Sequence, residues 1–454
     1  KMMLKVMIYS FSQKTYSSRQ IAKSLRENIN FMWIAGGNKP DFRTINRFRL
    51  DMKDVIEDVF YEVVKLLIEK KYIKLQNYFL DGTKIEANAN KYTFVWNKAV
   101  GNYDRKLDEK IKNHLREIDR IVAEENEIYL EDDLEETGVN SRITTGQVEG
   151  VVKSIDKKLA KNPMDKKLKK KAKEFKKDIL PRKQKYEEAF AIFEGRNSYS
   201  KTDHDATFMR MKEDAMLNGQ LKPGYNVQIG TENRYIVGFT IHPNPTDTKT
   251  MIPHLKHLEK RLGRLPENIV ADAGYGSEEN YEYLEEKNLG SYVKYNKFHW
   301  EKKKKNRENP YLTDNLPYIA ETDRFVCRNG KQLLHIGNRK YVTEAGYETR
   351  RDYYRCEDCT GCPYATECKN TDKNRTIMVS HRLNELKRKA NANLCSKRGH
   401  KLRSQRVVEV EQVFGRIKGC WSFRRFHLRG ADKVKIEWGL LAIAHNIAKM
   451  ALEG

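Results

Sequence analysis

RVVEVEQVFGRIKGCWSFRRFHLRG, residues 406–430, places one acidic side chain among many basic ones. The spacing predicts a helix in which Glu411 and Lys418 lie two turns apart on one face. Three arginines follow in the same stretch: Arg424, Arg425 and Arg429. An acid in such basic surroundings suggests a metal ligand that works beside a polyanion. The question for the rest of the chain is therefore which other carboxylates could join Glu411.

The composition points to a nucleic-acid partner. The 454-residue chain contains 87 Lys and Arg against 63 Asp and Glu, which gives a formal net charge of +24. Phosphate neutralisation explains this excess better than the alternative of a generally basic soluble protein. No apolar run approaches the roughly 20 residues that span a bilayer, so we predict no membrane partner. The opening KMMLKVMIYSF has helical spacing and no small-residue cleavage site, which predicts a helix rather than a signal peptide.

The cysteines predict a metal site and a reducing compartment. Seven cysteines is an odd number for a disulfide framework, which favours a cytoplasmic location. Four of them lie close together: Cys356, Cys359, Cys362 and Cys368. Such short thiolate spacings suit a structural Zn²⁺ ion, with a vestigial site or an iron–sulfur cluster as alternatives. Cys327 could replace one of the four ligands, whereas Cys395 and Cys420 are predicted to be ordinary buried thiols.

Residues 1–75 are predicted to form an all-helical domain. SSRQIAKSLREN begins at a serine cap and has one apolar face. After the break at AGGNKPD, Asp41 opens a second helix that carries Arg43 and Arg47. Two short helices around a Gly-rich turn suit a helix-turn-helix that binds DNA ends. A helical packing or dimer module fits the same spacing equally well.

The middle of the chain predicts an α/β core. The run NYFLDGTKIEANAN, within residues 76–97, begins as a strand that ends at Asp81. Residues 196–300 continue with an antiparallel hairpin, GYNVQIGTENRYIVGFTIHPNP, and a helix capped by Thr246 or Asp247. PENIVADAGYGS then predicts a strand that ends in an acid, followed by a helix and a further strand. We therefore expect a mixed sheet with helices packed on it.

Two insertions interrupt this core. Residues 98–195 predict a long helical hairpin with an acidic loop near residues 131–147. A coiled-coil-like seam marks its first arm: Leu107, Ile111, Leu115, Ile118 and Val122. The basic run DKKLKKKAKEFKK predicts a solvated face, with contact to the DNA backbone as the alternative. Residues 301–395 form a cysteine-rich insertion of short polar and aromatic segments, and residues 396–454 supply C-terminal core helices with the last acid.

Three carboxylates are the candidate catalytic centre. Asp81 and Asp272 each end a predicted strand, and Glu411 lies on the late helix. An acid at the end of a buried strand is costly unless it is paired or bound to metal. Three carboxylates without His or Cys suit Mg²⁺ or Mn²⁺. Two such ions would activate a water or a 3′-hydroxyl and stabilise the leaving oxygen of a phosphodiester.

Two further groups have open roles. Tyr225, Asn226 and Gln228 precede the hairpin turn, and strand alternation points Asn226 and Gln228 to the same side. Their amides either line the edge of the active site or satisfy the strand end. Three aromatic side chains favour core packing, with stacking on flipped bases as the alternative: Trp300, Trp421 and Phe423.

These motifs resemble those of insertion-sequence transposases of the DDE superfamily. VEQVFGRIK resembles the V-E-x-x-F-G-x-x-K stretch around the last acid of that family, and FLDGTKIEANA and VADAGYGSEEN resemble its first two acid motifs. The resemblance implies an RNase H-like core, Asp81, Asp272 and Glu411 as the catalytic acids, and Mg²⁺-dependent cleavage and joining of DNA. It also implies an N-terminal domain that helps to bind terminal inverted repeats, a homodimer in the synaptic complex, and a bacterial-type protein associated with the nucleoid.

The sequence departs from the family at one cation. The broader family often has Tyr-x₂-Arg-x₃-Glu-x₆-Lys around the last acid. Lys418 fits the lysine, but Val407 stands at the arginine and Ser404 at the tyrosine, with Arg406 next to them. Glu409 is the rival third acid, although it does not keep the spacing to Lys418. The DNA-contacting cations that we predict are Arg43, Arg47, Arg406, Lys418, Arg424, Arg425 and Arg429.

Two other functions fit the same sequence. One is a catalytically inactive transposase-derived protein that only binds DNA. The other is an RNase H-like host nuclease, which would cut DNA without joining it.

Overall fold

The computed structural model describes residues 1–125, 142–161, 163–211, 219–343 and 346–453. The chain divides into two compact units. Unit 1 comprises Lys1–Ile85, Asn226–His427 and Asp432–Gly454, and unit 2 comprises Glu86–Tyr225 and Leu428–Ala431.

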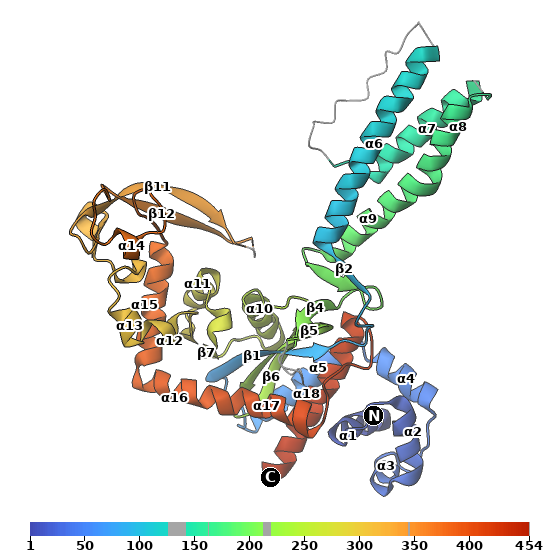
Figure 1. The fold of residues 1–454 in the computed structure, drawn as a ribbon. Helices are drawn as coiled ribbons and strands as arrows, with labels where there is room; N and C mark the ends of the chain where they lie inside the picture. Colours follow the sequence, from blue (N-terminus) through green and yellow to red (C-terminus); the bar gives the residue numbers. More distant parts are fainter. Residues whose placement is uncertain (126–141, 162, 212–218, 344–345, 454) are drawn as a thin grey trace. The chain divides into compact units, whose positions relative to one another are not determined.

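Five helices open unit 1 (Figure 1): α1 (Met2–Ser12), α2 (Ser18–Glu27), α3 (Ile29–Ile34), α4 (Phe42–Asp51) and α5 (Ile56–Glu69). The all-helical prediction for this region is therefore confirmed. The Asp41 side chain accepts the Thr44 N–H at 2.7 Å and caps α4, as the sequence predicts. Ser17 occupies the N-cap position of α2, but its side chain makes no capping hydrogen bond there.

A mixed sheet follows. In unit 1 it contains β1 (Asn77–Glu86), β6 (Tyr235–His242), β7 (Asn268–Ala271), β8 (Gly290–Val293) and most of β5 (Leu221–Glu232). The order is β5-β1-β7-β8, with β6 paired to the free side of β5. β1, β7 and β8 are parallel, whereas β5 and β6 form the predicted antiparallel hairpin. Figure 1 shows β1 beside β7 at the centre of this sheet. The predicted strand order along the chain is confirmed.

Helices cover the sheet, and the strand β7 at its centre is buried at every residue. α5 and α10 (Met251–Leu262) pack against β6, and α11 (Glu278–Glu286) packs against β8. α15 (His381–Cys395) packs on β8, and α16 (Lys397–Arg406) on β7 and β8. The last helix, α18 (Ala431–Glu453), is buried along its middle, where the Asn446 amide bonds both the N–H and the C=O of Ile236.

Unit 2 contains long helices: α6 (Asn97–Glu125), α7 (Thr145–Lys161), α8 (Lys166–Glu174), the π-helical turn η1 (Phe175–Ile179) and α9 (Leu180–Phe193). Leu107, Ile111 and Ile118 of the predicted seam are buried against α7 and α8. α7 ends at Lys161, and the Asp165 side chain caps α8. Most lysines of DKKLKKKAKEFKK are exposed, which fits the predicted solvated face. Residues 131–141 of the predicted acidic loop lie outside the described residues.

Shorter strands complete unit 2. β2 (Phe94–Trp96) pairs with β3 (Ser198–Ser200), and β4 (Thr207–Arg210) pairs with the first residues of β5. Arg196 joins α9 to the following loop, since its guanidinium donates to the carbonyls of Phe193 and His204.

The cysteine-rich segment of unit 1 contains a second sheet that the sequence did not predict. β9 (Tyr318–Ile319), β10 (Arg324–Val326), β11 (Gln332–Val342), β12 (Glu348–Cys356) and β13 (Thr376–Val379) form an antiparallel sheet. β11 and β12 form a long hairpin, visible in Figure 1. Most side chains of β11 are exposed, so the strand lacks the apolar alternation that marks a half-buried strand.

Two sequence predictions about local structure are wrong. α10 begins after Thr250 rather than after Thr246 or Asp247, because Asp247 belongs to the loop before the helix. Cys395 and Cys420 are exposed rather than buried. Among the described helices, none is long and apolar enough to cross a membrane.

Three histidines, of which His254 and His445 are buried and His242 is partly buried, make a pH-dependent contribution to the stability of unit 1. Burial lowers the pKa of His254 to about 3 and the pKa values of His242 and His445 to about 4, below the ordinary 6.5. In the unfolded chain these residues take up a proton near pH 6.5, whereas in the fold they stay neutral down to pH 3–4. Acid therefore favours the unfolded chain, and stability is lost as the pH falls through this window.

We expect the free energy of unfolding to be level from pH 8 to 7 and to fall by about 1 kcal/mol or more per histidine between pH 6.5 and 5. Urea denaturation at fixed pH values, followed by circular dichroism, measures this slope. His445→Gln should reduce the slope, because His445 hydrogen-bonds only the Arg234 carbonyl among its described contacts. An equal slope in the variant and the original chain would contradict the prediction.

Candidate active site

Asp81 and Asp272 lie side by side at the ends of two parallel strands. β1 and β7 pair in register up to Leu80 opposite Ala271, and each acid is the next residue. Equivalent positions on parallel neighbours point to the same side of a sheet. The carboxyl ends of parallel strands are where ligands bind in open α/β sheets. The structure thus brings the two strand-end acids together at such an edge.

Arg406 connects these two acids. Its Nη2 lies 2.8 Å from Asp81 Oδ2 and 3.6 Å from Asp272 Oδ2. The Arg406 side chain is only 10% exposed, and that of Asp81 is 15% exposed. Two carboxylates brought this close repel each other unless a positive charge lies between them. The pair therefore forms a site for a cation, which the guanidinium fills.

A second group of positive charges borders this pair. Lys294 follows Val293, which is opposite Ala271 in the β7–β8 pairing, so Lys294 continues the row of Asp81 and Asp272 across the strands. Burial lowers the pKa of Lys294, and the nearby Arg406 and Arg403 lower it further, while Asp272 acts in the opposite direction. The acids are thus flanked on the β8 side by two cations besides Arg406.

A third acid, which the sequence did not single out, lies against the same strand ends. The amides of Asn226 and Gln228 both donate to Asp247 Oδ1 at 2.8 Å. The two amides come from one face of β5, as alternation predicts, and both hold Asp247 beside the strand ends. A Cβ on Gly82 would lie 2.6 Å from Asp247 Oδ1, so the residue after Asp81 must be small for this approach.

Tyr275 is a buried residue near Asp247, Asp81 and Asp272. Its hydroxyl donates to the Gln228 side-chain oxygen. Burial holds the pKa of Tyr275 far above its ordinary value, and the surrounding charges of Asp247, Asp81 and Asp272 add to the effect. Three acids therefore surround one buried phenol. Only the fold shows that Asp247 accepts the hydrogen bonds of the two β5 amides.

The helix that carries Glu411 differs from the predicted regular one. A π-helical turn, η5 (Val407–Glu411), follows α16, and α17 (Gln412–Gly415) leads into a second one, η6 (Arg416–Cys420). Such i→i+5 turns are rare and frequently occur at functional sites. The turn brings Glu411 closer to the helix face that carries Arg406, since a regular α-helix would rotate residues five apart away from each other.

Glu409, the rival third acid, is committed to a structural contact. Its carboxylate accepts the Arg234 N–H at 2.6 Å at the turn between β5 and β6, and burial raises its pKa. Glu411 is exposed instead. Among the described residues, no three His, Cys, Asp or Glu side chains form a group that could hold a metal ion.

Two family models match the sequence. A transposase DDE domain matches residues 326–451, and a transposase domain (DUF772) matches residues 1–51. These two matches support an insertion-sequence DDE transposase. The first match includes Glu411, whereas Asp81 and Asp272 lie outside both ranges. No curated protein matches the sequence. The family acts on DNA and generally uses divalent metal ions.

The cations that we predicted to contact DNA have different surroundings. Arg43 and Arg47 are exposed on α4, and Arg424 and Arg425 are exposed after η6. Arg424 Nε donates to the Lys418 carbonyl at 3.2 Å, which links the end of η6 to the basic segment that follows. In unit 2, Arg429 Nε donates to the Asn88 carbonyl at 2.7 Å. Arg406 differs from the others because it is buried against the acids.

The three aromatic side chains differ in exposure. Trp421 and Phe423 are 6% and 1% exposed, and Phe423 packs edge-on against Tyr16. Core packing thus accounts for both. Trp300 is 37% exposed, and Lys297 lies over its ring. Trp300 therefore keeps a surface on which a base could stack.

The four cysteines predicted to bind zinc have different surroundings. Cys356 is buried, and this burial together with the neighbouring Cys359 side chain raises the pKa of Cys356 to about 12. Cys327 and Cys359 pack on the same apolar cluster as Cys356. Cys368, however, accepts a hydrogen bond from Arg375 Nη1 at 3.0 Å. The described cysteines form no metal-binding group of three or more.

Proposed function

We propose that this transposase cleaves DNA at the ends of its element and joins the freed 3′-hydroxyl ends to target DNA. The observation that supports this function best is the pair Asp81 and Asp272, which occupies adjacent strand ends and shares one cation. The three parallel strands with an antiparallel pair beside them support an RNase H-like core. The exposed Glu411 is the third proposed acid.

The residues at this edge fit hard divalent ions. Carboxylate oxygens without sulfur or imidazole neighbours are the ligands that Mg²⁺ or Mn²⁺ prefer. Asp81, Asp272 and Glu411 would hold them. Two such ions, when bound, supply the charge that activates the attacking oxygen and stabilises the leaving oxygen of the phosphodiester.

The cations beside the acids would hold the DNA backbone. Lys294 and Arg403 flank Asp272, so a phosphate brought to the acids would meet both side chains. Lys418 and Arg424 lie on the next segment of the chain and would hold flanking phosphates. Asp247, fixed by Asn226 and Gln228, would keep the turn after Asp81 in place and so position that acid.

The N-terminal helices would bind the terminal inverted repeats. Arg43 and Arg47 are exposed on α4, the second helix of the predicted helix-turn-helix. Two chains would bring two element ends together as a homodimer in a synaptic complex.

An assay on labelled duplexes that contain an element end separates this function from its two alternatives. We expect the full chain to nick the duplex only with Mg²⁺ or Mn²⁺ and to join the labelled 3′ end to a second DNA. Cutting without joined product would indicate a host nuclease. Binding without cutting at any divalent metal would indicate an inactive DNA-binding protein. Chelation with EDTA provides the control for metal dependence.

A structural zinc ion in the cysteine-rich segment stays a prediction from sequence spacing. The pair Cys356 and Cys359, with Cys327 on the same cluster, is the part of the thiol set that supports it. We expect elemental analysis of chain purified under reducing conditions to find about one zinc ion per chain, and Cys359→Ser to lose it. Cys395→Ser, at an exposed cysteine, is the matched control. Zinc-free original chain would contradict the prediction.

A further inference from the structure

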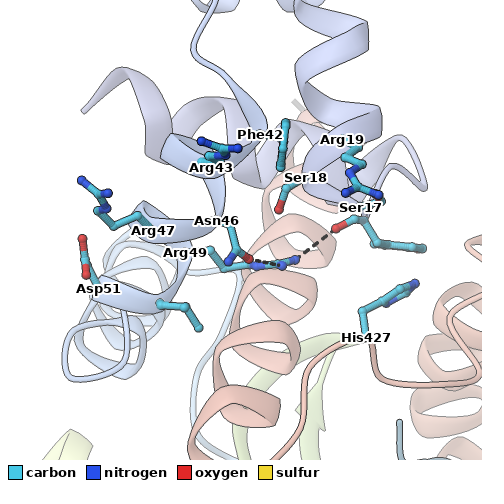
Figure 2. A pocket seen from close by; sticks show the side chains of 12 residues that line it. Ser17, Ser18, Arg19, Phe42, Arg43, Asn46, Arg47, Arg49, Asp51 and His427 are labelled. Atoms are coloured by element: carbon cyan, nitrogen blue, oxygen red, sulfur yellow. Dashed lines mark hydrogen bonds between the residues drawn. The ribbon is translucent and has the colours of Figure 1, made fainter.

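Unit 1 contains a cavity of about 660 Å³ between α2 and α4, and none of Asp81, Asp272 and Glu411 lines it. Tyr16, Ser17 and Ser18 line one side, the first turns of α4 line another, and His427 completes the wall. Figure 2 shows these side chains around the opening. The Tyr16 hydroxyl donates to the Trp421 carbonyl at 2.7 Å, so the C-terminal segment beyond η6 forms part of the wall. The volume is in the range of small-molecule sites.

The lining is strongly positive. Arg19, Arg43, Arg47 and Arg49 contribute to it, against one carboxylate, Asp51, among the described lining residues. Such a concentration of guanidinium groups in a concave site favours an anion, and guanidinium groups are well suited to phosphate. The first three arginines are exposed at the mouth, whereas Arg49 is 5% exposed at the base.

The cavity also holds buried polar atoms that lack a partner. Arg49 donates through Nη1 to the Tyr16 carbonyl and through Nη2 to the Asn46 side chain. Its Nε, and the Ser18 hydroxyl, are buried with no hydrogen-bond partner in the described part of the chain. Buried polar atoms are nearly always satisfied, so two such atoms on one cavity indicate a polar ligand.

An aromatic ring stands among these cations. Phe42 is 37% exposed at the start of α4 and lies between two guanidinium groups. Arg19 is 5.1 Å and Arg43 is 5.8 Å from the centre of the ring (Figure 2). Both arginines are exposed, so either can move aside and admit a flat ring against Phe42. A base stacks on an aromatic ring more strongly than an exposed guanidinium does.

We propose that this cavity takes one unpaired nucleotide of a DNA strand. The base lies against Phe42, and its flanking phosphates contact Arg19, Arg43 and Arg47. A bare phosphate would use the arginines but not the ring, and a paired base in a duplex has no free face to offer it. The proposal rests on the proposed function for its DNA partner and adds the recognition of an unpaired base.

The test uses the full chain, EDTA to prevent cleavage, and a fluorescein-labelled thymidine octamer read by anisotropy. We expect Phe42→Ala to weaken binding about tenfold and Phe42→Trp to preserve it. Trp33→Ala is the matched control, because Trp33 is 84% exposed in α3 and does not line this cavity. An octamer of abasic sites keeps the phosphates without the bases, and its binding should not respond to Phe42→Ala.

Three results would overturn the proposal. Equal octamer binding by Phe42→Ala and the original chain would remove the stacking contact. An equal loss with the abasic octamer would show that the substitution acts through folding or phosphates. Thymidine monophosphate binding as tightly as the octamer would assign the cavity to a free nucleotide. Each outcome is independent of cleavage, because the duplex-nicking assay uses the acids and Mg²⁺.

Discussion

Glu411→Gln is expected to lower metal-dependent DNA cleavage at least about a thousandfold while DNA binding stays within about twofold. The substitution removes the negative charge that a divalent ion would need from the third acid, but keeps the shape of the side chain. Glu411 is exposed, so its loss should not unfold the helix that carries it. Single-turnover nicking of an element-end duplex gives the rate, and a gel-shift titration gives the affinity.

Glu409→Gln is the matched control, two residues away in the same π-helical turn. Its carboxylate holds the Arg234 N–H, and a glutamine oxygen can accept the same hydrogen bond. We expect cleavage within a few-fold of the original chain. The reverse outcome, loss at Glu409 and full cleavage by Glu411→Gln, would transfer the third role to Glu409. Full cleavage by both variants would remove the η5 turn from the active site.

The sequence was most informative where local pattern determines position. Strand endings located Asp81 and Asp272, and parallel pairing was enough to bring them to one edge. The local sequence predicts Asp247 as a helix cap, because nothing near it in the sequence indicates that amides from β5 hold it. The same limit applies to the cavity at Phe42, which needs His427 from the other end of the chain. The local spacing of residues does not predict contacts between segments that are far apart along the chain.

The sequence pattern also does not predict sheets whose strands are mostly exposed to solvent. β11 and β12 carry many charged and exposed residues, so neither shows the apolar alternation that predicts a strand. Their stability comes from a small cluster at one end, around Phe325, Leu333 and Tyr354. The η5 turn was also missed, since helical periodicity does not distinguish a single i→i+5 turn from a regular one.

Lys183→Met is expected to destabilise unit 2 by about 3–5 kcal/mol. Lys183 is fully buried between α6 and α9, and its Nζ lies 2.7 Å from Asp104 Oδ1 and 2.6 Å from Asp108 Oδ1. Methionine fills a similar volume but leaves two buried carboxylates with less compensation. Arg142 keeps one contact, at 2.6 Å to Asp104 Oδ2, and it cannot replace the contact to Asp108. Urea denaturation of the full chain, followed by helical circular dichroism, measures the loss.

Two further variants separate the buried charges from a general effect of removing a lysine. Lys176→Met breaks an ion pair with Asp156 in the same helical hairpin, but both side chains are nearly half exposed. Exposed pairs contribute about 0–1 kcal/mol, so this variant should unfold close to the original chain. Adding Asp104→Asn and Asp108→Asn to Lys183→Met removes the stranded charges and should recover part of the stability. Equal destabilisation by Lys176→Met and Lys183→Met would show that the buried ammonium does not hold the hairpin together.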